Sequence, residues 1–178
     1  LGYGVTVQPS GALDRAGRAV AGEWPHVALV FTASCWWPSL VSLGVLALAF
    51  AAIMPAWRAR VLFSVLTTVV AWQASDAVKN AFGRTRPSYW LLHHETSASY
   101  PSGHAMFAVV VYGLWSYYVA TSALPVTPRR VLAALIALWG VGVIWSRLAL
   151  GAHYVTDLIG GVLFAIAMLA AATAIGPN

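Results

Sequence analysis

A histidine and an aspartate stand four residues apart near the end of the chain. If His153 and Asp157 belong to one helix, they project from the same face, because positions i and i+4 are neighbours there. The carboxylate could then hold one ring nitrogen as N–H and leave the other as a free lone pair, which is the orienting half of a nucleophilic triad. A pair without function on a helix surface is the alternative, since an isolated HxxxD pattern has low specificity.

A second histidine follows a sequence typical of a helix start. Pro101-Ser102-Gly103-His104 precedes a long apolar run, so we expect Ser102 to be the N-cap and Gly103 to let a ligand approach the backbone. Free amides at a helix start bind phosphate oxygens. His104 would stand over the same anion and could give a proton to a leaving oxygen. The alternative is that this tetrapeptide is an ordinary helix cap followed by a histidine at the membrane interface.

Three cationic side chains accompany the histidines, namely Lys79, Arg86 and Arg147. They would supply permanent positive charge for an anion whose charge spreads over three oxygens in the transition state of phosphoryl transfer. Taken singly, each could instead snorkel from hydrocarbon to the interface, and for Arg84 we favour that interpretation. For the other three, their convergence with the histidines favours a phosphate site.

The two histidines and the aspartate could also ligate zinc. Three nearby cations would repel a divalent metal and attract phosphate, so we expect metal-free chemistry. The adjacent residues His93-His94-Glu95 could form a second metal cluster, but neighbouring histidines point apart. We interpret them as loop residues, with contact with substrate as the alternative.

The elements that position these residues are predicted to be membrane-spanning helices. The chain is 60% hydrophobic and 8% charged, whereas about 25% of residues are charged in an ordinary soluble domain. The net charge of +5 comes from basic residues that form neither a run nor a stripe, so it does not indicate nucleic-acid binding. A spanning helix needs about 20 mostly apolar residues. Five segments meet or approach this length: 36–54, 61–78, 105–124, 131–145 and 154–175.

The connections between these segments divide the basic residues between two faces. The longer connections, 79–104 and 146–153, share one face and carry all the unusual chemistry. Four arginines lie in the two short connections, as the positive-inside rule expects of a cytoplasmic face: Arg58, Arg60, Arg129 and Arg130. The opposite face holds six basic residues, four of them in the clusters near the histidines, which we discount. We therefore expect the site on the extracytoplasmic face.

The N-terminal part differs from the rest in its spaced charges. We expect residues 11–22 to form an amphipathic interfacial helix, with a mobile tail as the alternative. The whole chain, 1–178, is interpreted as one domain, with an N-terminal segment over 1–34 and a helix bundle over 35–178. The chain opens without a charged segment that precedes an apolar run, so no signal peptide is expected.

Taken together, these residues resemble the type 2 phosphatidic acid phosphatase superfamily of lipid phosphatases. Its signature is Lys, six residues, Arg-Pro; then Pro-Ser-Gly-His; then Ser-Arg, five residues, His, three residues, Asp. The corresponding residues are Lys79 with Arg86-Pro87, Pro101 to His104, and Ser146-Arg147 with His153 and Asp157. All three spacings and their order match, across residues 79–157.

The resemblance implies a role for each of these positions. His153 would attack phosphorus to form a phosphohistidine, Asp157 would orient it, and His104 would protonate the leaving group. The phosphoryl oxygens would be held by Lys79, Arg86, Ser102, the Gly103 amide and Arg147. No metal or other cofactor is implied. The family fold is an all-α bundle, usually of six spanning helices. The first of these is expected before the interfacial segment; either it lies outside this sequence or residues 1–34 replace it.

The expected function is hydrolysis of a lipid phosphate at the extracytoplasmic surface. The candidate substrates are polyprenyl diphosphate, slightly favoured by analogy alone, phosphatidic acid and phosphatidylglycerol phosphate. The partners expected are this substrate and membrane lipids, without nucleic acid, and the oligomeric state is left open. Two alternatives are a vanadate-dependent haloperoxidase, which five apolar spans argue against, and a non-catalytic lipid transporter or scaffold.

Overall fold

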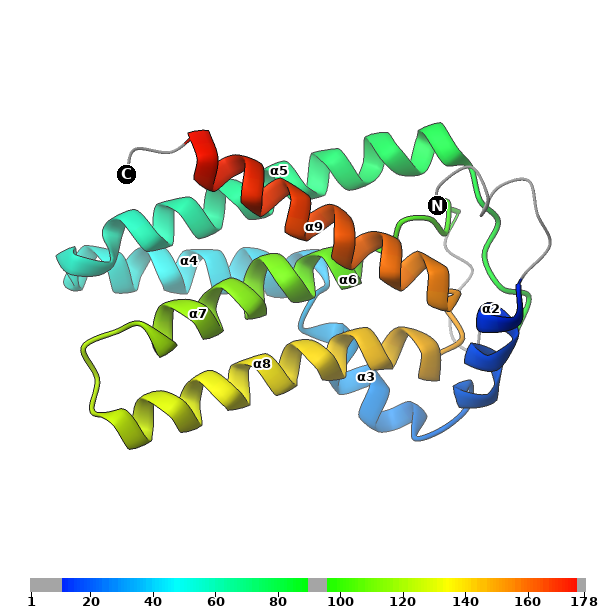
Figure 1. Ribbon diagram of the computed structural model, residues 1–178, viewed down its shortest axis with the longest axis horizontal. Helices are drawn as coiled ribbons and strands as arrows, with labels where there is room; N and C mark the ends of the chain where they lie inside the picture. The colour runs from blue at the N-terminus through cyan, green and yellow to red at the C-terminus, as the bar shows by residue number, and fades with distance from the viewer. Residues whose placement is uncertain (1–10, 90–95, 176–178) are drawn as a thin grey trace.

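The computed structural model describes residues 11–89 and 96–175, and within these ranges every regular element is a helix. Figure 1 shows the long helices lying side by side along the longest axis of the molecule. In chain order the elements are α2 (Ala12–Gly17), η1 (Arg18–Val20), α3 (Pro25–Ala33), α4 (Trp37–Ile53), η2 (Pro55–Trp57), α5 (Arg58–Phe82), α6 (Gly103–Phe107), η3 (Ala108–Gly113), α7 (Leu114–Ala120), α8 (Val126–Ala149) and α9 (Val155–Ile175). The expectation of an all-α chain is therefore confirmed over the described residues.

Three helical segments are long and apolar enough to cross a membrane: Pro55–Phe82, Val126–Ala149 and Val155–Ala174. A fourth span results if α3 and α4, which are bent by 47° at their junction, are taken as one. The predicted segment 105–124 corresponds to α6, η3 and α7. These follow one another without a break, and η3 is a π-helical turn between the two α-helices. The count of five spans remains a prediction.

Large apolar side chains project outward along the bundle. Examples are Leu46 of α4, Leu66 of α5 and Leu138 of α8, each 64–65% exposed. A helix that is apolar on its outer as well as its inner face is typical of a membrane span, because all its backbone hydrogen bonds are made internally and the side chains tolerate hydrocarbon.

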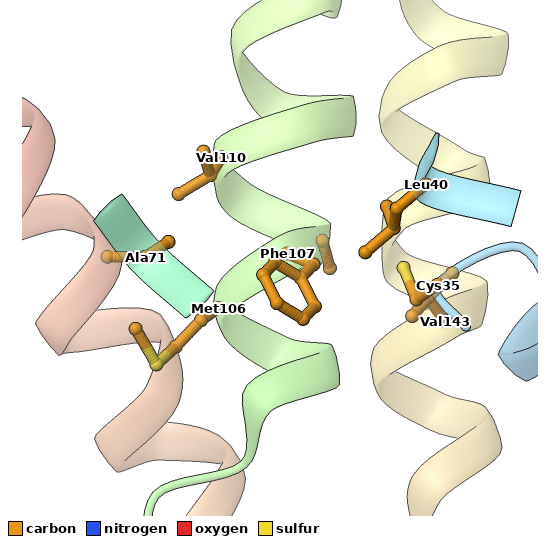
Figure 2. Close-up of a cluster of buried hydrophobic side chains, with 9 residues drawn as sticks. Cys35, Leu40, Ala71, Met106, Phe107, Val110 and Val143 are labelled. Atoms are coloured by element: carbon orange, nitrogen blue, oxygen red, sulfur yellow. The ribbon is translucent and has the colours of Figure 1, made fainter. Parts of the chain in front are cut away.

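The core of the bundle lies around α6, the short helix that carries His104. Figure 2 shows Met106 and Phe107 of α6 meeting side chains from the neighbouring helices, among them Ala71 of α5 and Val143 of α8. Cys35, between α3 and α4, belongs to the same cluster and is 2% exposed. This packing seats the start of α6 inside the bundle rather than on its surface.

Two adjacent glycines let the start of α6 lie directly on α9. A Cβ at Gly161 would be 2.5 Å from the Ser102 carbonyl oxygen and 3.0 Å from the Ala105 Cβ. A Cβ at Gly160 would be 2.4 Å from the ring of Tyr100. Real Cβ contacts are wider than this. The close approach of α9 to the start of α6 therefore requires that positions 160 and 161 have no side chain.

The N-terminal helix is more buried than the sequence predicted. Residues 12–20 are helical, within the expected interfacial helix 11–22, but Asp14 is buried against the bundle rather than facing water. The location of this helix at a membrane interface remains a prediction. The helix α3 was not predicted; it packs on α8, where a Cβ at Gly142 would be 2.4 Å from the Phe31 ring.

Candidate active site

The predicted site residues gather at one end of the bundle. Figure 1 shows that the C-terminal end of α5, the start of α6, the end of α8, the start of α9 and α2 all lie at this end. The connections from α4 to α5 and from α7 to α8 lie at the other end. The segments that carry the three sequence clusters are therefore neighbours in space.

His153 and Asp157 interact as the spacing predicted, but His153 is not on the helix. It lies in the turn before α9, which begins at Val155 and carries Asp157 in its first turn. The His153 Nδ1 atom is 3.3 Å from Asp157 Oδ2, and both side chains are buried. The turn is held by the Ala152 amide, which donates to the Arg147 carbonyl at the end of α8. The contact predicted for one helix is thus made across a turn and a helix start.

The Asp157 carboxylate has a complete set of hydrogen-bond donors. One oxygen accepts from the Ser99 hydroxyl and, at 3.0 Å, from the Tyr154 amide. The other accepts from Arg84 Nη1 at 2.5 Å. The side chain is also fully buried. These contacts fix the carboxylate in one orientation, so it can in turn fix the orientation of the His153 ring.

Arg86 determines which nitrogen of His153 carries the proton. Its Nη1 atom is 3.1 Å from His153 Nε2 and also donates to the Ala152 carbonyl. Its other nitrogens donate to the carbonyl and hydroxyl oxygens of Ser97. A guanidinium can only donate hydrogen bonds, so Nε2 is the acceptor and Nδ1 carries the hydrogen that faces Asp157. The Nε2 lone pair therefore points away from Asp157 and toward Arg86.

Burial keeps this imidazole neutral. Desolvation lowers the pKa of His153 to about 3; the hydrogen bond to Asp157 opposes the shift, and the charges of Arg86 and Arg147 add to it. A neutral ring with its proton on Nδ1 has a nucleophilic Nε2 at physiological pH.

The start of α6 has the geometry expected of a capped helix. The Ser102 side chain accepts from the Ala105 amide at 3.4 Å, which confirms the N-cap. A Cβ at Gly103 would be 3.2 Å from the Ser75 hydroxyl and 3.8 Å from Lys79 Nζ. The backbone at Gly103 is thus open to the lysine of α5.

His104 lies within electrostatic range of the other predicted residues. The cations that act on its imidazole are Arg147, Lys79 and Arg86, and the His153 ring lies within the same range. Within residues 11–89 and 96–175, no group forms a hydrogen bond with the buried Nε2 atom of His104. This nitrogen is a natural partner for a ligand oxygen.

Arg147 reaches the site from α8. Its side chain is buried, and its Nη1 atom donates to Thr32 Oγ1 of α3 at 2.5 Å. Burial of a permanent cation is costly unless hydrogen bonds and a counter-charge compensate it. An anion bound between the histidines would provide such a counter-charge.

A polar cleft of about 460 Å³ adjoins these residues. Its walls come from the end of α5 and from the segments on both sides of residues 90–95, and they include Lys79, Asn80, Arg86 and Ser97. Arg86 both lines this cleft and contacts His153, so this side chain connects the cleft to the His153 ring. It has the charge and polarity to admit a phosphate group.

The family model of the PAP2 superfamily matches residues 57–178. The chain belongs to this superfamily. The match contains every residue of the predicted site and excludes α2 and α3.

Among PAP2 relatives, the chain is similar to phosphatidylglycerophosphatase B of Bacillus subtilis (strain 168), with 38% identity over 92 residues that cover 49% of this chain and 43% of the relative. It is 37% identical over 86 residues to phosphatidylglycerophosphatase B of Escherichia coli (strain K12), covering 48% and 31%. The chain spans less than half the length of these curated relatives.

The fold is similar to a solved PAP2 structure. The crystal structure of the first transmembrane PAP2 type phosphatidylglycerolphosphate phosphatase from Bacillus subtilis matches with a TM-score of 0.73 and 26% identity, covering 93% of this chain and 85% of that one. This chain is accordingly a PAP2-type integral-membrane protein.

One interpretation from the sequence was wrong. Arg84 does not snorkel to an interface; it is 8% exposed and lies between Asp157 and Asp14. Snorkelling was favoured because convergence with the histidines was expected for Lys79, Arg86 and Arg147 but not for Arg84.

Ser99 was also missed, although it stands only three residues before Ser102 and bonds to Asp157. Its place two residues before the helix-start tetrapeptide was the only signal that could have indicated it. His93, His94 and Glu95 lie outside the described residues.

Proposed function

We propose that this protein hydrolyses a membrane-borne phosphomonoester or diphosphate through a phosphohistidine at His153. The observation that supports it most is that both nitrogens of the His153 ring have a partner, Asp157 at Nδ1 and Arg86 at Nε2. This arrangement gives a neutral, oriented imidazole whose lone pair lies beside a guanidinium that can bind phosphate.

The reaction follows from these positions in two displacements. The Nε2 lone pair attacks phosphorus, and a P–N bond forms as the P–O bond to the lipid breaks. A protonated His104 gives its proton to the departing oxygen. Water then attacks phosphorus and gives a proton to His104, the P–N electron pair returns to His153, and inorganic phosphate leaves.

Cationic and amide groups would hold the phosphoryl oxygens in both steps. On arrival of the phosphate, Arg86 would turn from the Nε2 atom to an oxygen of the substrate. The same role is proposed for Lys79, Ser102, the Gly103 amide and Arg147. With this concentration of positive charge no divalent metal is needed to neutralise the anion, so we propose a metal-independent reaction.

Phosphatidylglycerol phosphate is the first substrate to test. The curated relatives and the solved structure carry this lipid in their names, whereas polyprenyl diphosphate was favoured from the sequence by analogy alone. Phosphatidic acid and polyprenyl diphosphate remain candidates. We place the reaction on the extracytoplasmic face, following the distribution of arginines.

A phosphate-release assay in mixed micelles tests the proposal. We expect His153→Ala to lower the rate by about a thousandfold or more, because removal of a nucleophile abolishes the covalent path. The exposed His26 offers a matched control, and His26→Ala should keep wild-type activity.

Two further arms of this assay separate the alternatives. Radiolabelled phosphatidylglycerol phosphate, quenched during turnover, should label wild-type protein but not His153→Ala. A chelator should leave the rate unchanged. Phosphate release that persists at the wild-type rate without His153 would contradict the assignment, and lipid movement across vesicles without any phosphate release would indicate a transporter.

A further inference from the structure

A buried aspartate from the N-terminal helix stands behind the site. Asp14 of α2 is 3% exposed, although it lies far from the family motifs in the sequence. Its Oδ1 atom accepts from the Thr156 amide and hydroxyl, each at 2.9 Å. Its Oδ2 atom accepts from Arg84 Nη2 at 2.8 Å. Asp14 is therefore fixed to the first turn of α9, next to the residue that holds Asp157.

Arg84 joins this aspartate to the one that orients the nucleophile. Its Nη2 atom bonds to Asp14 and its Nη1 atom bonds to Asp157 Oδ1 at 2.5 Å. Its guanidinium carbon lies 4.2 Å from the centre of the Tyr154 ring. Two nitrogens of the guanidinium are therefore paired with carboxylates, and one face of the group packs on the Tyr154 ring. The guanidinium cannot rotate without breaking at least one of these contacts.

The charges of these three side chains explain why the second aspartate is needed. Arg84 alone would neutralise Asp157 and draw its negative charge away from His153. With Asp14 present, the Asp157–Arg84–Asp14 trio retains one net negative charge in a buried place, where charge interactions are weakly screened. That charge faces the Nδ1–H of His153 and stabilises the positive ring that forms when Nε2 attacks phosphorus.

We propose that Asp14 is a positioning residue for the nucleophile, acting through Arg84 on Asp157. This inference rests on the proposed function, because turnover is its readout. Asp14 lies outside the region that the family model matches, so the N-terminal helix contributes to a site whose motifs all lie within residues 79–157.

The substitution Asp14→Asn tests the charge while it preserves the shape. Asparagine retains an oxygen for the Thr156 amide but presents an NH₂ group to Arg84, which breaks the ion pair. We expect kcat for lipid phosphate to fall about tenfold, as the loss of one buried charge predicts. KM should change by less than about twofold, because Asp14 does not contact substrate. The control Glu23→Gln removes an exposed charge from the same N-terminal part and should leave both constants unchanged.

A charge-compensated variant separates this role from simple support of the fold. In Asp14→Asn/Arg84→Gln the cation that neutralises Asp157 in the single variant is gone, the glutamine can still donate to Asp157, and the net charge of the trio is again negative. We expect kcat to recover to within about threefold of wild type. A purely structural role predicts that the double variant is as slow as Asp14→Asn or slower. Since its net charge equals that of the wild-type trio, this variant also serves if Asp14→Asn does not fold.

A second combination tests whether Asp14 acts through Asp157. In an Asp157→Asn background, we expect Asp14→Asn to cause no further loss of kcat. Independent losses that multiply would overturn the inference, as would unchanged kcat in Asp14→Asn alone. If the wild-type protein released no phosphate from any lipid, the proposed function itself would fail, which is a different result from either of these.

Discussion

At the residue scale, His153 depends on three neighbours from two separate parts of the chain. Asp157 follows it directly, but Arg86 and Ser99 come from the long connection between α5 and α6. Each restricts the ring in a different way: Arg86 occupies Nε2, while Asp157 and Ser99 face Nδ1. The ring is also desolvated. Burial of the His153 ring among these neighbours therefore both fixes its orientation and keeps it neutral.

The titration of His153 predicts a pH dependence of stability. Burial lowers the pKa of His153 to about 3 from a value of 6.5, so between these values the unfolded chain binds a proton that the native chain does not. The stabilisation is fully present above about pH 6.5 and is lost as the pH falls toward about 3. We expect the free energy of unfolding in detergent micelles to decrease over this range, measured by thermal or denaturant unfolding monitored by tryptophan fluorescence.

The variant His153→Gln checks the origin of this effect. Its stability should depend less steeply on pH in the same window, because one proton-binding group is missing from the unfolded chain. His26→Gln, at an exposed position, should keep the wild-type slope. An unchanged slope in His153→Gln would show that other groups produce the acid sensitivity.

At the element scale, the contact of α6 with α9 decides where His104 stands relative to His153. The Ser102 amide donates to the Asp157 carbonyl at 3.0 Å, which ties the two segments together at the site. The glycines of α9 allow this distance, since any side chain there would occupy the space of Ser102 or Tyr100. The two histidines are therefore placed by a backbone contact rather than by their own side chains.

We expect Gly161→Ala to separate these segments and reduce activity by about tenfold or more, as small misplacements of catalytic groups do. The added Cβ would meet backbone and a neighbouring Cβ, not a flexible side-chain end, so the strain should also lower the unfolding temperature. Gly44→Ala in α4 is the matched control, because a Cβ there has nothing within 4 Å. Phosphate release and thermal unfolding measure the two effects. Wild-type activity in Gly161→Ala would contradict this account of the contact.

The element bounds were predictable where apolar runs were long. The segments 61–78, 131–145 and 154–175 lie within or close to α5, α8 and α9, and the structure extends the first two by several residues into the charged ends. At these ends Arg58 donates to the Ala51 carbonyl and Arg129 donates to the Ser122 carbonyl, so charged residues are accommodated within the helices. Short helices such as α3 could not be predicted in this way, since α3 is stabilised by its packing on α8.

At the scale of the whole molecule, the two ends of the bundle differ in chemistry. One end carries the histidines and the polar cleft, and the other carries arginines next to aromatic rings, where the Arg60 guanidinium lies 5.1 Å from the Trp57 ring centre. Exposed apolar side chains lie between the ends. This division is typical of a protein whose two ends face opposite sides of a bilayer.

Thiol labelling can test which end faces outward. Cys35 is the only cysteine in the chain and is buried, so Cys35→Ala gives a clean background for new thiols. We expect Thr96→Cys, at the exposed edge of the cleft, to react with a membrane-impermeant maleimide in right-side-out vesicles. Thr127→Cys, exposed at the opposite end, should react only after permeabilisation. The reverse pattern would place the site on the cytoplasmic face.

The sequence by itself determined the helical class, the membrane character and the residues of the three motifs. These features are local, because apolar run length and motif spacing can be read along the chain. Only the tertiary structure decided that Arg84 is buried between two carboxylates, that Ser99 holds Asp157, and that Asp14 reaches α9 from the N-terminal helix. Such contacts join residues more than fifty positions apart, and no periodicity records them; they exist because burial forces each charged or polar group to find a partner wherever the fold provides one.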